Sequence, residues 1–110
     1  MSQQHKSLAA GRWEQLSFCE QMANIASEVE RALNWQAKGN PAYSQKAFER
    51  SLELMDLTVK HLKGFYRLRE LTRVREALVD YFKGYNQFGS TQATWKSYFL
   101  PFVYASRREY

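Results

Sequence analysis

Apolar residues recur at every third or fourth position in four successive stretches of the chain, which is the spacing of amphipathic α-helices. The first stretch begins at Ser17, and Ser17 with Glu20 matches a capping box, in which both side chains satisfy free backbone N–H groups. Its apolar positions are Phe18, Met22, Ile25, Val29 and Leu33. Gly39, Asn40 and Pro41 then predict the end of one helix and the start of the next.

The second and third stretches predict helices over residues 41–62 and 65–83, separated by a break at Gly64. In the second, the 4-3-4-3 spacing is typical of coiled-coil-like packing, and the stripe is Phe48, Leu52, Met55, Val59 and Leu62. In the third, either Val74 or Arg75 points inward together with Leu68, Leu71, Leu78 and Phe82. Each helix therefore offers one face to its neighbours.

The last stretch predicts a helix that follows a glycine-bounded loop at residues 84–89 and is capped by Ser90 or Thr91. One of its faces combines Trp95, Tyr98, Phe99, Phe102 and Ala105. Pro101 lies inside this helix and cannot donate a hydrogen bond to the preceding turn. We therefore expect a kink or break near Tyr98.

Short connections between these helices favour neighbours that run in opposite directions. We predict an all-α fold, an antiparallel up-and-down four-helix bundle whose fourth helix is kinked near Pro101. Residues 17–110 would form this single domain. Residues 1–16 would be an N-terminal tail or lead-in segment, in which Trp13 and Leu16 pack as a hydrophobic lead-in and residues 1–7 are disordered.

The composition fits one globular domain of 110 residues and 13.0 kDa. Five glycines and two prolines are too few for the many turns of an all-β fold. The one cysteine excludes an internal disulfide and fits a reducing compartment. No apolar run reaches the roughly 18 residues of a transmembrane helix, and the N-terminus lacks the apolar centre of a signal peptide. We therefore expect a cytoplasmic protein that does not bind membranes.

The histidines and the cysteine give no support to catalysis or metal binding. His5 and His61 are the two histidines, and Thr58 instead of glutamate precedes His61 by three residues, which excludes a dinuclear carboxylate site. One cysteine and one helical histidine do not supply the ligands of a zinc site. Cys19 lies beside the apolar stripe, as a structural residue would. We expect no catalytic residue, no metal and no cofactor.

Charge is unevenly distributed along the chain, whose net charge is +5. Residues 57–110 hold ten of the 16 basic residues and four of the 11 acidic ones. A surface of one sign attracts polyanions, and the anion-binding candidates are Lys63, Arg67, Arg69, Arg73 and Arg75. These bases could instead pair with acids of the second and third helices, namely Glu49, Glu53, Asp56, Glu70, Glu76 and Asp80. The sequence leaves both interpretations open.

Aromatic residues make up 17 of the 110 positions, and most of them follow Gly64. One helix face cannot bury them all, and such a surplus is typical of surfaces between proteins. We expect Tyr98, Phe102 and Tyr104 to form an interface, either in a homo-oligomer such as a dimer or with a different protein. The alternative is that the N-terminal segment folds over them.

A smaller polar group lies on the first helix. It consists of Glu28, Glu30 and Arg31, near Asn24 and Ser27. Asn24 is placed where it could reach an arginine of the third helix, in a buried polar network that sets the helix register. The same residues could instead form the rim of a small pocket. An enzyme with a pocket built on Glu28 and Arg31 is therefore a further hypothesis.

Five segments resemble a family of small helical proteins from bacteria and archaea, namely residues 20–33, 47–54, 68–70, 75–82 and 90–91. The resemblance spans about residues 17–108 and implies an all-helical prokaryotic protein, but it brings no activity. The general shape is also similar to HEPN-like and substrate-binding partners of minimal nucleotidyltransferases. HEPN-type ribonucleases carry an arginine a few residues before a histidine, and no arginine precedes His61 by four to six residues. That similarity implies a non-catalytic binding or regulatory subunit.

These observations predict a protein that is not an enzyme and that acts by binding another protein, as a regulatory or interaction subunit that self-associates. The alternative is a nucleic-acid or phosphate binder that uses the basic third helix. Binding of the second kind would weaken steeply with salt, because each neutralised phosphate releases counterions.

Overall fold

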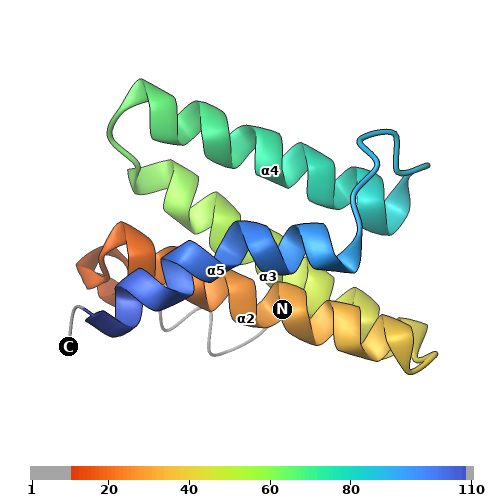
Figure 1. The fold of residues 1–110 in the computed structure, drawn as a ribbon. Helices are drawn as coiled ribbons and strands as arrows, with labels where there is room; N and C mark the ends of the chain where they lie inside the picture. Colours follow the sequence, from red (N-terminus) through yellow and green to blue (C-terminus); the bar gives the residue numbers. More distant parts are fainter. Residues whose placement is uncertain (1–10, 109–110) are drawn as a thin grey trace.

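The computed structural model describes residues 11–108, and this part of the chain is all-helical. A short 3₁₀ helix, η2 (Trp13–Gln15), precedes α2 (Phe18–Ala37), α3 (Pro41–His61), α4 (Phe65–Lys83) and α5 (Gln92–Arg108). Residues 11–108 contain no strand. The prediction of an all-α fold with four main helices is confirmed, and the arrangement in Figure 1 is compatible with a helical bundle. The disorder predicted for residues 1–7 lies outside the described residues.

Local hydrogen bonds explain where the first two long helices begin. The Ser17 hydroxyl accepts from the Glu20 backbone N–H (3.1 Å), and a Glu20 carboxylate oxygen accepts from the Ser17 N–H (2.9 Å). This reciprocal pair is the capping box expected at this position. The Asn40 side chain accepts from the Tyr43 N–H (3.1 Å), and Pro41 occupies the first turn of α3. Gly39 reverses the chain between the two helices with a φ of +75°.

The start of α5 is fixed in a similar way. The Thr91 hydroxyl accepts from the Thr94 N–H (3.1 Å), and the Thr94 hydroxyl accepts from the Thr91 N–H (3.2 Å). Thr91 is therefore the cap of this helix. The helix continues through Pro101 to Arg108 without interruption, so the break that we considered near Tyr98 is absent. A kink at Pro101 and an antiparallel order of the helices stay predictions.

The packing order of the helices determines which faces are covered. The helix α2 packs against both α3 and α5, whereas α4 packs against α3. The backbones of α4 and α5 barely approach each other. In Figure 1, α4 accordingly lies at one side of the molecule, along α3, while α5 lies over α2. One long side of α4 thus remains available to other molecules.

The core is formed by α2, α3, α4 and α5, and the lead-in segment contributes to it. Trp13 is only 1% exposed, and its indole N–H donates to the Thr58 hydroxyl (3.0 Å). The Gln21 amide donates to the Trp13 carbonyl (2.9 Å) and so ties η2 to α2. Other fully buried core residues include Met22, Ile25, Met55, Leu71 and Leu78. The predicted packing of Trp13 and Leu16 as a hydrophobic lead-in agrees with these contacts.

The buried face of α3 differs from the predicted stripe. Leu52, Val59 and Leu62 are only half-buried, whereas three hydroxyl residues spaced seven apart are buried, namely Ser44, Ser51 and Thr58. Their hydroxyl groups donate to the carbonyls of Ala32 (2.9 Å), Phe48 (2.6 Å) and Leu54 (2.9 Å). Each buried hydroxyl is thus satisfied by backbone, so these residues fit into an apolar interface.

The inward face of α4 is formed by Leu71, Val74 and Leu78. Of the two alternatives at positions 74 and 75, Val74 is the buried one. Leu68, expected inward, is exposed, and Phe82 is half-buried. On α5, Trp95 and Phe99 are buried. Within residues 11–108, no helix has both the length and the apolar character that a bilayer crossing requires.

Candidate binding surface on α4 and α5

Two of the five anion-binding candidates are engaged in contacts within the protein. Arg75 forms an ion pair with Asp56, with 2.9 Å between its Nε and the Asp56 Oδ1, and so joins α4 to α3. The Arg67 guanidinium lies over the Phe18 ring, with 4.6 Å from its central carbon to the ring centroid. Both cations help to hold α4 in place.

The other three candidates, Lys63, Arg69 and Arg73, are exposed. No residue in the described part of the chain forms an ion pair with any of them. Arg69 and Arg73 are four residues apart and therefore share one face of α4. These cations remain available to an acidic partner.

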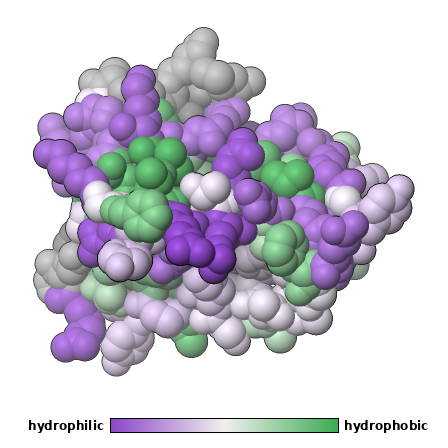
Figure 2. Space-filling model, turned by 90° about the horizontal axis from the view of Figure 1, so that it is seen from above, coloured by the Kyte–Doolittle hydropathy of each residue, from purple (hydrophilic) through white to green (hydrophobic). Residues whose placement is uncertain are grey.

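Two aromatic rings lie about one helical turn before Arg69 and two turns before Arg73. Phe65 is 67% exposed and Tyr66 is 84% exposed, and their rings meet edge to face with centroids 5.8 Å apart. We call the set Lys63, Phe65, Tyr66, Arg69 and Arg73 the α4 surface. Figure 2 looks down on the α4 side of the molecule and shows apolar side chains gathered near one end of this face, next to strongly hydrophilic ones. The α4 surface thus combines exposed rings with unpaired cations.

A groove lies between α4 and α5, where the two backbones stay apart. Its volume is about 590 Å³, and Val74, Ala77, Trp95, Tyr98 and Phe88 line it, with Arg73 at its border with the α4 surface. The carboxylate of Asp80 accepts from the N–H groups of Gln87 (2.9 Å) and Phe88 (3.0 Å), which fixes the connecting loop beside the groove. Phe88 is 64% exposed there.

The three interface candidates of α5 lie in different environments. The half-buried Tyr98 donates its hydroxyl to a carboxylate oxygen of Glu70 (2.9 Å) and thereby links α5 to α4. Burial raises the pKa of Tyr98 far above its ordinary value, and the hydrogen bond and charge of Glu70 raise it further. Phe102 is half-buried and meets the Phe18 ring edge to face. Tyr104 is 63% exposed and remains available to a partner.

The polar group on α2 does not form the network considered from the sequence. Asn24 is exposed and donates to the carbonyl of Glu20 on its own helix (2.8 Å), so the predicted contact with an arginine of α4 is wrong. Arg31 pairs with Glu28 at 2.9 Å, one turn away on the same helix. The groove between α2 and α5 is lined by Glu30, and neither Glu28 nor Arg31 borders it. A pocket enzyme built on Glu28 and Arg31 thus lacks a site in this groove.

Some contacts of this region could not be found by sequence reasoning. His61 pairs with Glu14 at 3.1 Å and joins η2 to the end of α3, a contact between residues 47 positions apart.

Cys19 is half-buried on α2. The residues that the structure describes contain no group of three or more histidine, cysteine or acidic side chains that could hold a metal ion.

Neither the family models, nor the curated proteins, nor the solved structures with which the chain was compared gave a match. Function is therefore inferred from the geometry of the chain itself.

Proposed function

We propose that the protein is a non-enzymatic binding protein, a regulatory or interaction subunit, and that its partner is another protein bound by the α4 surface and the adjoining groove. The observation that carries this function is the pair of exposed rings, Phe65 and Tyr66, beside Arg69 and Arg73, which form no ion pair with any residue of 11–108. Tyrosine, other aromatic residues and arginine are the types that dominate binding energy in protein interfaces.

The surroundings of this surface favour a protein partner. The groove beside Arg73 has apolar walls and can receive an apolar side chain. Acidic residues of α4 lie among the cations, including Glu76 at the groove and Glu70 at the hydroxyl of Tyr98. A surface of mixed sign with an apolar cleft suits the varied side chains of a protein better than the uniform charge of a nucleic acid.

Affinity capture from the native host tests this function. The tagged wild type, carried through nuclease treatment, is expected to retain a defined protein partner, and the pair Tyr66→Ala with Arg73→Glu is expected to lose it. Tyr85→Ala is the matched control for the ring, because Tyr85 is 93% exposed but lies in the loop after α4. Equal capture by the wild type and the α4 variant, with helix content unchanged, would contradict the proposed surface.

A second candidate function is binding of nucleic acid or another polyanion, favoured by the three cations without an ion-pair partner among residues 11–108. Its signature is salt dependence, since log affinity falls by about 0.9 per neutralised duplex phosphate for each tenfold rise in salt. Arg69→Glu with Arg73→Glu should abolish such binding. Lys38→Glu with Lys46→Glu makes the same charge change beside the turn between α2 and α3 and should have a much smaller effect. Binding that is absent or independent of salt would remove this candidate.

A further inference from the structure

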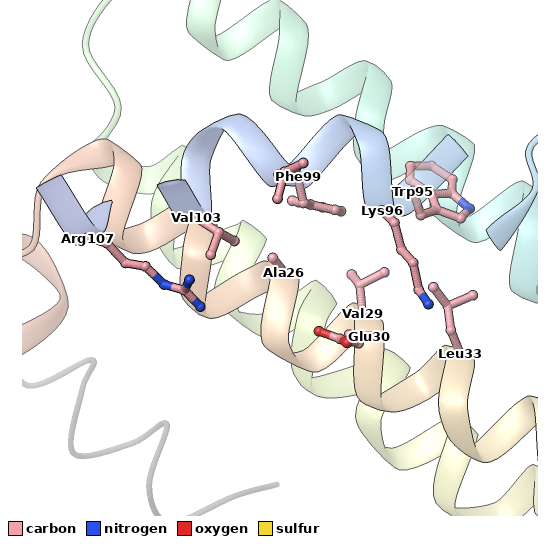
Figure 3. A pocket seen from close by; sticks show the side chains of 10 residues that line it. Ala26, Val29, Glu30, Leu33, Trp95, Lys96, Phe99, Val103 and Arg107 are labelled. Atoms are coloured by element: carbon pink, nitrogen blue, oxygen red, sulfur yellow. The ribbon is translucent and has the colours of Figure 1, made fainter. Parts of the chain in front are cut away.

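A second groove, separate from the α4 surface, runs between α2 and α5. Its volume is about 280 Å³, and its apolar walls are Ala26, Val29 and Leu33 from α2 and Phe99 and Val103 from α5. Figure 3 shows these side chains facing one another across the space between the two helices. The groove is therefore an apolar depression, and Trp95 is the one lining residue that it shares with the groove between α4 and α5.

Exposed apolar side chains stand beside this depression. Leu100 borders the groove and is 62% exposed, and Tyr104 follows one turn later on α5 and is 63% exposed. A large exposed leucine next to an apolar depression provides both a projection and a recess on one surface. Such a surface can fit a second copy of itself when the two copies are related by a twofold axis.

The charges around the groove are also complementary to those of a second copy of the chain. Glu30 of α2 and the two cations Lys96 and Arg107 of α5 line it. In the view of Figure 3 the Glu30 side chain lies between those of Lys96 and Arg107. No ion pair joins any of the three to another residue in the described part of the chain. Both signs are thus presented together and unpaired, whereas a patch of one sign would repel its own copy.

We propose that the α2–α5 groove is the dimerisation surface of this protein, in which each copy inserts Leu100 toward the groove of the other and Glu30 of each copy faces Lys96 and Arg107 of the other. A twofold interface places the same patch on both sides, so residue i meets residue j and j meets i. Two sets of opposite charges then form at once around an apolar centre. The contacts proposed for the dimer, from Leu100, Glu30, Lys96 and Arg107, involve no residue of the α4 surface and none that lines the groove between α4 and α5.

Charge exchange between two full-length variants tests this dimer. The acidic side is reversed by Glu30→Lys and the basic side by Lys96→Glu with Arg107→Glu. Each variant alone places like charges opposite each other twice, and we expect its self-association to be about tenfold weaker or worse than that of the wild type. In an equimolar mixture, a heterodimer holds one native and one reversed contact, so every acid again meets a base.

The readout is sedimentation equilibrium of the wild type, each variant and the mixture over a range of concentrations. We expect a dimer for the wild type, mainly monomer for each variant alone, and a restored dimer in the mixture. Glu49→Lys, an exposed charge reversal on α3, is the matched control and should dimerise like the wild type. Leu100→Ser should also weaken the dimer, while its helix content stays unchanged because the side chain is mostly exposed.

Two results would overturn the dimer. One is a wild type that remains monomeric throughout the concentration range. The other is a mixture of the two charge variants that associates no better than either variant alone. Neither result affects capture of a partner by the α4 surface, because the charge variants leave Phe65, Tyr66, Arg69 and Arg73 intact.

Discussion

At the scale of single residues, buried hydroxyl groups form hydrogen bonds that the hydropathy pattern of the chain does not predict. Thr58 illustrates this, because its hydroxyl accepts from the Trp13 indole and donates to the Leu54 carbonyl at once. Trp13 is a large fully buried side chain, so its one polar atom needs that acceptor. The bond between Trp13 and Thr58 joins residues 45 positions apart and fixes the lead-in segment on the core.

Thr58→Val should therefore destabilise the protein, because it leaves the buried indole N–H without an acceptor. The expected loss in the free energy of unfolding is about 1–3 kcal/mol. Thr72→Val is a matched control, since Thr72 also donates to a carbonyl four residues earlier but is exposed. Its effect should stay within about 0.5 kcal/mol. Denaturant unfolding measures both, and equal losses would show that the Trp13 bond contributes nothing.

Tyr98 predicts a dependence of stability on alkaline pH. Its pKa is raised in the folded protein by burial and by Glu70, so the folded state keeps a proton that the unfolded state releases above about pH 10. The unfolded state then binds fewer protons, and the free energy of unfolding falls as pH rises past that value. Below it, the contribution of Tyr98 is fully present.

Tyr98→Phe should remove this part of the alkaline loss, because phenylalanine has no proton to release. Denaturant unfolding of both proteins across alkaline pH measures the difference in slope. Tyrosinate absorbance provides a second measurement, since one tyrosine of the wild type should ionise only when the chain unfolds. Identical slopes for the wild type and Tyr98→Phe would contradict this role of Tyr98.

At the scale of helices, local sequence signals predicted the boundaries well. The capping box at Ser17, the cap at Asn40 and the glycine at position 64 act within a few residues, so their effect is visible in the sequence. The phase of the buried face of α3 was predicted less well. Ser44 and Ser51 count as polar in any hydropathy pattern, yet both are buried because their hydroxyls bond to nearby carbonyls.

Contacts between helices also determine which of the basic residues are engaged within the protein. Arg75 pairs with Asp56 across α3 and α4, as one of the two interpretations of the sequence expected. Arg67 instead stacks on Phe18, a contact that requires knowledge of how α4 lies relative to α2. The sequence could name the five candidate cations, but it could not separate the engaged ones from Lys63, Arg69 and Arg73.

At the scale of the whole molecule, the arrangement of the helices produces the proposed surfaces. Because α4 packs against α3 and barely approaches α5, an open groove remains next to Arg73, and the Tyr98–Glu70 bond spans the two helices. The surplus of aromatic residues after Gly64 did predict exposed rings. The exposed rings on α4 are Phe65 and Tyr66, whereas the candidates Tyr98 and Phe102 contribute to internal contacts.

The most direct test of the central claim is photo-crosslinking in the native host, with p-benzoylphenylalanine placed at position 66 or at position 85. Both positions carry highly exposed tyrosines, but only Tyr66 belongs to the α4 surface. We predict a defined adduct with one other protein from position 66 and none from position 85. The absence of an adduct at position 66, or the same adducts from both positions, would contradict the proposal that α4 binds a protein partner.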